Sequence, residues 1–470
     1  MSNTRREFMR RSVFAGAGMI AAPGAVHGDT AAPEFAPPSG ETGDDTPYDV
    51  AVIGAGTAGT IAAIQAGRLG LRTLLVEKNG MPGGTTTVAS VNFPGIFHAW
   101  GRQVIAGIGW ELVSRTVALC GETLPDFTRA PQHHWQHQVR VNRAVYAALA
   151  CEAFIKAGVS VRFHTMPAGI EEDEDGFTLS LCTKTGLTSA RARTLIDASG
   201  DAVAAGMAGY PLVTHAIRQP GTLIFSMTGY DFGALDRDAL RRAFDQAVKS
   251  GELTEADRAF VRHNILNLLR AKGDNCTHVP GMDGRTSAGR TEAELQSRAS
   301  LLRVYRFLRG QPGLEKLQID FMAPECGVRE TVTIQGETTV TGGDYVTGRL
   351  WDDAVCYSFY PIDLHLPAGG GIDTRPLQPE TFPTVPRGAL VPAGSTRMLV
   401  AGRCLSSDRE ANSALRVQAT CMACGQAAAV IAATALREGV PVMGTDLEAI
   451  RYTLRQHQAI VPTAGGPVSA

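Results

Sequence analysis

The sequence has 470 residues, of which 44% are hydrophobic and 19% are charged, and its formal net charge is −2. This length suits two domains around a large core, and the near-neutral charge provides no basic surface for nucleic acid or for an anionic membrane. The nine cysteines are scattered and odd in number, which excludes a disulfide scaffold, and no run of four cysteines predicts an iron–sulfur cluster.

The N-terminal segment has the features of an export signal. Arg5 and Arg6 are followed by a mildly apolar stretch, residues 12–22, which is too short to span a bilayer. Paired arginines before such a stretch are typical of a twin-arginine signal peptide. We therefore expect export by the twin-arginine translocase, cleavage after Gly28, and a periplasmic or secreted protein without a stable membrane anchor. The alternative is a basic N-terminus on a cytosolic enzyme. Residues 29–46 predict a disordered linker.

The first predicted elements form the start of a βαβ unit. Residues 49–53 are a short apolar run that ends in glycines, as in a buried parallel strand. Residues 57–69 predict an alanine-rich helix, and residues 73–76 predict a second buried strand.

Strands and helices like those of this βαβ unit are predicted at both ends of the chain, whereas the middle of the chain has a different pattern. In chain order we expect a helix at 141–157, a strand at 159–163, antiparallel strands at 177–181 and 190–196, helices within 231–272 and at 291–309, an irregular segment at 361–392, a strand at 398–401 and a helix at 417–437. We therefore predict an α/β fold, with a Rossmann-like nucleotide-binding domain built from residues 47–211 and 394–470 and an inserted α+β substrate domain at 212–393.

A GxGxxG motif joins the first strand to the first helix. Gly54 permits the tight turn, Gly56 lets a pyrophosphate approach the backbone, and Gly59 lets helix and strand pack closely. Glu77 ends the next strand, where its carboxylate can accept hydrogen bonds from a ribose. The alternative is a strand-to-helix turn without a ligand, which the position of Glu77 disfavours.

Three further turns follow strands or strand-like segments. The Gly83-Gly84-Thr85 turn suits the longer dinucleotide FAD better than NAD, because backbone amides and a hydroxyl must meet its phosphate and ribityl groups. Gly200 and Asp201 follow one predicted strand, and Gly402 and Arg403 follow the last one, at strand ends where doubly wound folds bind ligands.

At this point the sequence resembles a known family. The segments that carry the resemblance are residues 83–86, 107–112, 327–330, 360–365, 401–404 and 419–428. They are similar to the bacterial FAD-dependent oxidoreductases of the glutathione-reductase-type FAD fold, which are related to the flavin core of heterodisulfide reductase. The iron–sulfur modules of that reductase are absent from the sequence, so its activity is not expected here.

The resemblance implies further cofactor contacts. The chain near Met166 would present backbone groups to adenine, and Gly402 and Arg403 would lie by the ribityl chain or pyrophosphate. The helix that begins near Thr420 would direct its N-terminus, with Cys421 and Met422, at the pyrimidine edge of the flavin. The partial positive charge of a helix N-terminus stabilises the negative charge of reduced flavin.

Three residues are candidates for substrate chemistry. His98 lies in a Pro- and Gly-bounded loop after the predicted flavin-facing glycines, and His365 ends a second Pro-bounded segment. Either imidazole could take a substrate proton while hydride leaves for flavin N5. Arg329 could bind a carboxylate or orient a carbonyl. Each of the three could equally be a hydrogen-bonded structural residue.

Two other patterns are less persuasive. His133 and His137 could share a helix face, but no carboxylate or cysteine stands at a helpful spacing, so we expect no metal site. Cys421 and Cys424 could form a redox pair, although small residues three apart on an alanine-rich helix are more often packing residues.

These features predict an exported, FAD-dependent dehydrogenase or oxidase of a small organic substrate, which passes electrons to an acceptor or to oxygen. One alternative is a reductase of an activated double bond. Another is a non-catalytic FAD-binding protein for electron relay or assembly. A second dinucleotide fingerprint for NADPH is not visible in the sequence, which disfavours a nicotinamide-linked disulfide reductase.

Overall fold

The computed structural model describes residues 46–129, 134–367 and 371–467. The predicted signal peptide and all of the predicted linker except Thr46 lie outside these residues.

A parallel sheet supports the predicted dinucleotide-binding domain. Its strands are β1 (Tyr48–Ile53), β2 (Thr73–Val76), β5 (Ser160–Arg162), β8 (Gly186–Asp197) and β18 (Met398–Val400). They are hydrogen-bonded in the order β5-β2-β1-β8-β18, all parallel. The apolar runs of β1 and β2 are completely buried, as expected for strands covered on both faces. The predicted α/β, Rossmann-like fold is confirmed.

Strand β8 also belongs to an antiparallel excursion. Its first half pairs with β7 (Gly176–Thr183), which pairs in turn with β6 (Met166–Asp173). The sequence predicted β7 and β8 but not β6, because β6 contains Pro167 and Gly169 and ends in acidic residues, which are poor strand formers.

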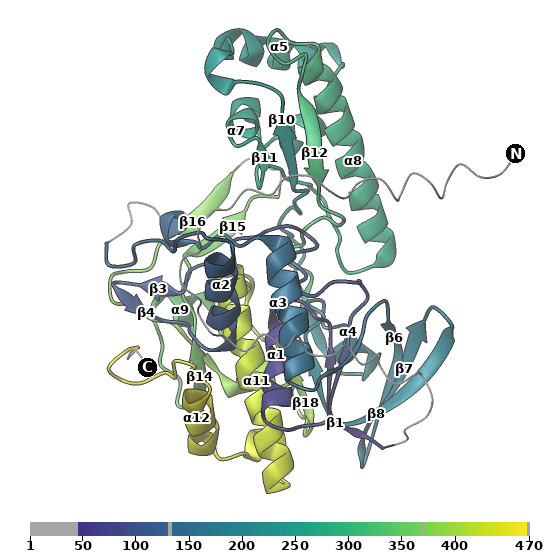
Figure 1. The fold of residues 1–470 in the computed structure, drawn as a ribbon, viewed down its shortest axis with the longest axis vertical. Helices are drawn as coiled ribbons and strands as arrows, with labels where there is room; N and C mark the ends of the chain where they lie inside the picture. The colour runs from purple at the N-terminus through teal and green to yellow at the C-terminus, as the bar shows by residue number, and fades with distance from the viewer. Residues whose placement is uncertain (1–45, 130–133, 368–370, 468–470) are drawn as a thin grey trace, which may run out of the picture. The chain divides into compact units, whose positions relative to one another are not determined.

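Helices from both ends of the chain pack together against the parallel sheet. Helix α1 (Thr57–Arg68) lies beside α11 (Gln418–Glu438), with α2 (Ile108–Leu119) and α3 (Arg143–Lys156) nearby (Figure 1). The α1 and α11 backbones come so close that a Cβ on Gly425 would lie 2.2 Å from the Ala58 carbonyl oxygen. Among the described residues, α11 is the one helix long and apolar enough to cross a membrane, and 83% of its most apolar window is buried inside the protein.

A second hydrophobic core is built from residues 223–328, the helical lobe drawn in teal and green in Figure 1. Its helices are α5 (Arg237–Ser250), α6 (Glu255–Phe260), α7 (Ile265–Arg270) and α8 (Ser287–Arg309). A small antiparallel sheet in the order β11-β10-β12 completes it, formed by β11 (Gly273–Asp274), β10 (Phe225–Thr228) and β12 (Gln318–Met322).

The rest of the predicted inserted domain packs elsewhere. The buried residues Tyr345, Tyr357 and Leu390 belong to the first core, with the parallel sheet. This part of the chain contains β13 (Val332–Ile334), α9 (Gly342–Val346), β14 (Ala354–Tyr357), β15 (Ile362–His365), β16 (Ile372–Arg375), β17 (Thr384–Pro386) and the 3-10 helix η4 (Arg387–Leu390). The segment 212–393 is therefore divided between two cores. The stretch 361–392 was expected to be irregular, but it contains the β15–β16 hairpin and strand β17. The sequence did not predict these strands because prolines and glycines are dense in this stretch.

Candidate active site

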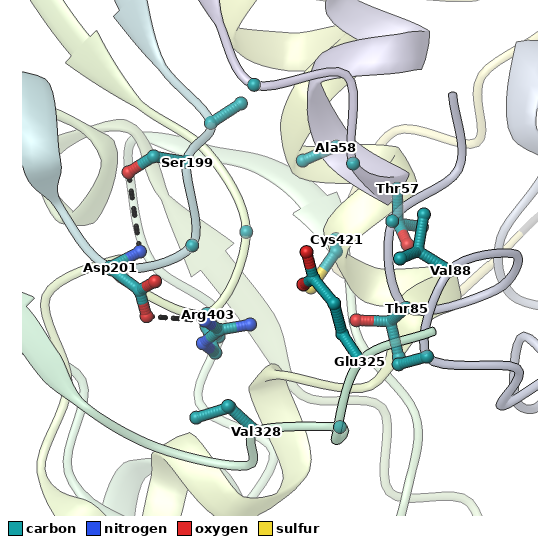
Figure 2. Close-up of a pocket in the computed structure, with 18 of the residues that line it drawn as sticks. Thr57, Ala58, Thr85, Val88, Ser199, Asp201, Glu325, Val328, Arg403 and Cys421 are labelled. Carbon is teal, nitrogen blue, oxygen red and sulfur yellow. Dashed lines mark hydrogen bonds and ion pairs between the residues drawn. The ribbon is translucent and has the colours of Figure 1, made fainter. Parts of the chain in front are cut away.

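The carboxyl ends of β1, β2, β8 and β18 open onto a cavity with about 970 Å³ of empty space, here called the first cavity (Figure 2). Ligands of open parallel sheets bind at this edge. Its lining includes these residues of the sequence prediction: Gly54, Gly56, Glu77, Gly84, Thr85, Gly200, Asp201, Gly402, Arg403 and Cys421.

The GxGxxG turn has the geometry predicted for a pyrophosphate site. Gly54 has a φ of +94°, a conformation that favours glycine, and a Cβ on Gly59 would lie 1.8 Å from the Gly54 carbonyl oxygen. A Cβ on Gly56 would meet only the Ala198 carbonyl oxygen, at 3.9 Å. Gly56 is also the N-cap of α1 and provides no side-chain cap, so open space and helix N–H groups face the cavity together.

Glu77 is held at one end of the first cavity. Its side chain is buried, and its two carboxylate oxygens accept hydrogen bonds from the backbone N–H groups of Ala55 (2.7 Å) and Asn79 (2.8 Å). Burial raises the pKa of Glu77, against the lowering effect of these two N–H groups. Each oxygen keeps a lone pair for a ribose hydroxyl. Nearby, Lys78 and Glu325 form an ion pair of 2.7 Å.

The second glycine turn closes on the first. Gly83 donates its backbone N–H to the Ala55 carbonyl oxygen (2.7 Å), and a Cβ on Gly84 would lie 2.9 Å from the Gly56 Cα atom. Gly84 and Thr85 line the cavity, whereas Gly83 is not among its lining residues.

The turns after β8 and β18 are joined by an ion pair, drawn as a dashed line in Figure 2. Asp201 accepts from Arg403 (2.5 Å) and from Arg290 of the helical lobe (2.8 Å). Burial raises the pKa of Asp201, but the two guanidinium groups outweigh it and hold that pKa below its ordinary value. Gly200 and Gly402, with φ of +79° and +99°, let the backbone approach the cavity beside this pair.

Helix α11 begins at Gln418 and directs its N-terminus at the cavity. Gln418 and Cys421 line the cavity, and the N-cap residue Val417 provides no side-chain cap. The Cys421 thiol donates to the Arg416 carbonyl oxygen (3.2 Å), and burial raises its pKa. Cys424 faces Cys356, with the two sulfur atoms 3.9 Å apart and not bonded.

Four predicted cofactor residues lie off the cavity lining: Gly59 and Gly83, which pack within the two glycine turns, and Met422 and Met166. Met422 is 1% exposed and packs against Gly109 of α2 rather than lining the cavity. Met166 is 53% exposed at the start of β6. The preceding residue, Thr165, donates its N–H to the Glu77 carbonyl oxygen (3.0 Å), so the backbone near Met166 lies beside the Glu77 end.

A second cavity, with about 650 Å³ of empty space, adjoins the first. The two cavities share a wall formed by Thr85, Gly327, Val328, Arg329, Arg416 and Gln418. Beyond this wall the second cavity is lined by Gln138, Tyr360, Asp363 and His365, among others.

Arg329 and Arg416 stand in the shared wall. Arg329 is 9% exposed and donates to the Pro220 carbonyl oxygen (2.6 Å). Among the described residues it has no carboxylate within ion-pair distance. Burial and the neighbouring Arg416 charge lower the pKa of Arg329 to about 9. Arg416 donates to Gln219 Oε1 (3.2 Å) and the Asp363 carbonyl oxygen (3.1 Å), and its Nη2 lies 3.6 Å from Asp363 Oδ2.

His365 has partners at both ring nitrogens. Its Nε2 lies 3.2 Å from Asp363 Oδ2, and its Nδ1 lies 2.8 Å from Nε2 of His278 in the helical lobe. Burial, followed by the Arg329 charge, lowers the pKa of His365 to about 3. Burial raises the pKa of Asp363, but its hydrogen bond to His365 and the two arginines outweigh this and lower it to about 2. An ionised Asp363 and a neutral His365 require the His365 Nε2–H to donate to Asp363, so Nδ1 accepts from His278.

His98 lies in a different environment. It begins the short strand β3 (His98–Ala99), stacks on Phe127 with the ring centroids 3.8 Å apart, and meets the Trp110 ring at 5.2 Å. Burial, with a smaller contribution from His137, lowers the pKa of His98 to about 4. His98 does not line the first or the second cavity, so its proton-transfer role stays a prediction without support from the geometry.

Sequence reasoning did not find several residues of the site. Asp363 stands two positions before His365 in β15, a spacing that places both on one face of a strand and could have been noticed. Arg416 directly precedes the N-cap of the predicted last helix. His278 had no signal, because only the fold brings this loop of the helical lobe to His365. His133, from the discarded metal pattern, lies outside the described residues, and within them no cluster suited to a metal is found.

Comparison with known proteins identifies the family. A family model described as "FAD dependent oxidoreductase" matches residues 49–454. A curated relative, the dihydrolipoyl dehydrogenase of Trypanosoma brucei brucei, is 48% identical over 54 residues, so the match spans 11% of this chain and 11% of that enzyme. A geranylgeranyl bacteriochlorophyll reductase-like protein of Thermoplasma acidophilum is 14% identical with a TM-score of 0.39, over 87% of this chain and 83% of that one.

The myxobacterial chondrochloren halogenase CndH is also 14% identical with a TM-score of 0.39, over 87% of this chain and 79% of that one. Structural likenesses at this level carry no argument about substrate or reaction. The family model, by contrast, covers most of the chain and includes every element that lines the first cavity. The chain belongs to the FAD dependent oxidoreductase family.

Proposed function

We propose that this FAD-dependent oxidoreductase is a dehydrogenase or oxidase, and that its small organic substrate binds in the second cavity. One observation carries the proposal: the second cavity shares the wall of Thr85, Arg329, Arg416 and Gln418 with the first. A substrate there lies next to the α11 end of the first cavity, where a helix N-terminus suits the flavin ring.

The residues of the first cavity fit FAD. The open space at Gly56 and the uncapped N-terminus of α1 suit the pyrophosphate, and Glu77 presents carboxylate lone pairs to the adenosine ribose. Gly402 and Arg403 also line the first cavity, and in this proposal the ribityl chain passes them. When bound, FAD supplies a two-electron acceptor that takes hydride at N5.

The Asp363–His365 pair is the proton acceptor in this proposal. When the substrate C–H bond breaks and both electrons leave as hydride, an alcohol or amine must also lose its O–H or N–H proton to a base. Both ring nitrogens of His365 already have partners, so the proton goes to a free lone pair of the Asp363 carboxylate, which His365 orients by its hydrogen bond. The C–O or C–N bond becomes double, and the electrons pass on to oxygen or to an electron-transfer partner.

Anaerobic mixing of the holoenzyme with panels of alcohols, amines and organic acids tests the direction of electron flow. Bleaching of the yellow flavin absorbance by one compound class supports a dehydrogenase or oxidase. If no compound bleaches the flavin but an enoate reoxidises the dithionite-reduced enzyme, the protein is a reductase and the proposal is wrong. A folded holoprotein that does neither would be a relay or assembly protein.

We also propose that the enzyme is exported folded, with FAD already bound, through the twin-arginine pathway to the periplasm or beyond. The support is the sequence alone: Arg5 and Arg6 before an apolar stretch, and a cofactor that is taken up in the cytoplasm. Changing both arginines to lysine should leave yellow precursor in the cytoplasm. Undiminished periplasmic enzyme after that change would contradict export by this route.

A further inference from the structure

The second cavity carries an excess of positive charge. Its charged lining residues are Arg329, Arg416 and Asp363, which together give two cations against one anion. His365 adds no charge, since its pKa lies far below neutral pH. Buried charges in proteins are normally paired, because an uncompensated ion loses its hydration without a partner. The cavity therefore has one positive charge that no lining residue offsets.

Arg329 and Arg416 both have donor capacity left over. Within the described part of the chain, Arg329 hydrogen-bonds strongly only to the Pro220 carbonyl oxygen, with Thr222 Oγ1 at the limiting distance of 3.5 Å. The buried Nε of Arg416 has no hydrogen-bond partner among the residues that the structure describes, and its carboxylate neighbour Asp363 is 3.6 Å away. Both guanidinium groups are fixed to neighbouring backbone or side chains, so they are held in place before a ligand arrives.

A neighbouring element adds to the positive potential. The cavity is lined by Val417 and Gln418, the N-cap and first residue of the 21-residue helix α11. A helix N-terminus carries about half a positive charge. Planar guanidinium groups match the two oxygens of a carboxylate, and a single unpaired charge suits a monoanion better than a phosphate dianion.

We propose that the second cavity binds its substrate through a carboxylate held by Arg329 and Arg416, so the substrate is a small organic acid. The role of the bound acid as a substrate rests on the proposed function. The anion site itself does not depend on turnover. The carboxylate end lies at the two arginines of the shared wall, and the carbon to be oxidised lies beside them, next to the rest of that wall and within reach of the Asp363–His365 pair.

The test measures binding to the oxidised holoenzyme without turnover. Acetate, benzoate and malonate are titrated by calorimetry and by the change in the visible flavin spectrum, against the matched neutral amides acetamide and benzamide. Inorganic phosphate is a further arm. We expect the carboxylates to bind and the amides not to bind. Arg329→Gln and Arg416→Gln should weaken carboxylate binding about 10- to 100-fold, the worth of one charge-assisted hydrogen bond.

Control variants keep the result interpretable. Arg241→Gln removes an exposed arginine of α5, paired with Asp238, and should leave carboxylate affinity unchanged. If a glutamine variant does not fold or retain FAD, Arg329→Lys and Arg416→Lys keep the charge but lose the planar fork, and they should still weaken binding. Equal affinity for carboxylates and amides, tighter binding of phosphate than of any carboxylate, or glutamine variants with wild-type affinity would each overturn the proposal.

The outcomes separate this inference from the proposed function. Carboxylate binding that depends on both arginines, without flavin bleaching by any organic acid, supports the anion site and contradicts the dehydrogenase. Bleaching by neutral alcohols or amines, with no carboxylate binding, supports the dehydrogenase and contradicts the anion site.

Discussion

Two glycines of one turn should respond in opposite ways to the same added methyl group. Gly56 has a backbone conformation that any residue adopts (φ −67°, ψ −167°), and a methyl group there meets only the Ala198 carbonyl oxygen, at 3.9 Å. A methyl group on Gly59 would lie 1.8 Å from the Gly54 carbonyl oxygen and 2.9 Å from the Ala198 Cβ atom.

These distances give the expected magnitudes. Gly56→Ala should leave the FAD-free fold intact, or stabilise it by about 0.4–1 kcal/mol through a less flexible unfolded chain. In the holoprotein the methyl group occupies the space that the pyrophosphate needs. Losing one backbone N–H contact to a phosphate costs about 1.5–3 kcal/mol, which weakens FAD binding about 10- to 150-fold. Gly59→Ala should instead destabilise the fold by about 1–3 kcal/mol or more, because the clash is with backbone.

Denaturant unfolding of the FAD-free proteins, followed by fluorescence titration with FAD, measures both effects on the same samples. Wild-type FAD affinity in Gly56→Ala would refute the assignment of this turn to the pyrophosphate. Wild-type unfolding free energy in Gly59→Ala would refute the packing on which the turn depends.

Four other predictions concern single side chains. Glu77→Ala should weaken FAD binding by about 1.5–3 kcal/mol in a direct titration, and unchanged affinity would remove Glu77 from the ribose. Asp363→Asn should keep the flavin content and slow flavin reduction about 10²- to 10⁴-fold. In the His98→Gln variant the flavin should be reduced at the wild-type rate. The reverse pattern of the two variants in stopped-flow traces would make His98 the base. Because the pKa of His98 falls from 6.5 to about 4 on folding, the unfolded chain binds the proton more tightly. The contribution of neutral His98 to the free energy of unfolding is complete above about pH 6.5 and is lost as the pH falls to about 4. His98→Phe should therefore make the free energy of unfolding less dependent on pH between about pH 4 and 6.5. If the slope of unfolding free energy against pH stays the same in the variant, His98 is not buried as a neutral ring.

Local patterns predicted the fold well, because each depends on neighbours in the sequence. The apolar run before Gly54 and the alanine-rich segment after Val417 have the periodicity of a buried strand and a buried helix, and both are present within one or two residues. Gly54, Gly56 and Glu77 line the cavity at the edge of the sheet, and this position follows from the strand–turn–helix unit, which is itself local.

The substrate site is harder to predict because it is assembled from distant segments. His98 follows the Gly83-Gly84-Thr85 turn by about a dozen residues, but the chain turns it into an aromatic cluster with Phe127. His278 and His365, 87 residues apart, meet at 2.8 Å. Sequence spacing gives no measure of such contacts.

A crystal structure of the protein with FAD bound, at a resolution where the isoalloxazine ring is visible, tests the central claim most directly. We expect adenosine at Glu77, the pyrophosphate at Gly56, and the flavin ring against the wall formed by Arg329 and Arg416. A ring at the Glu77 end, or a ring separated from the second cavity by protein, would contradict the proposed function.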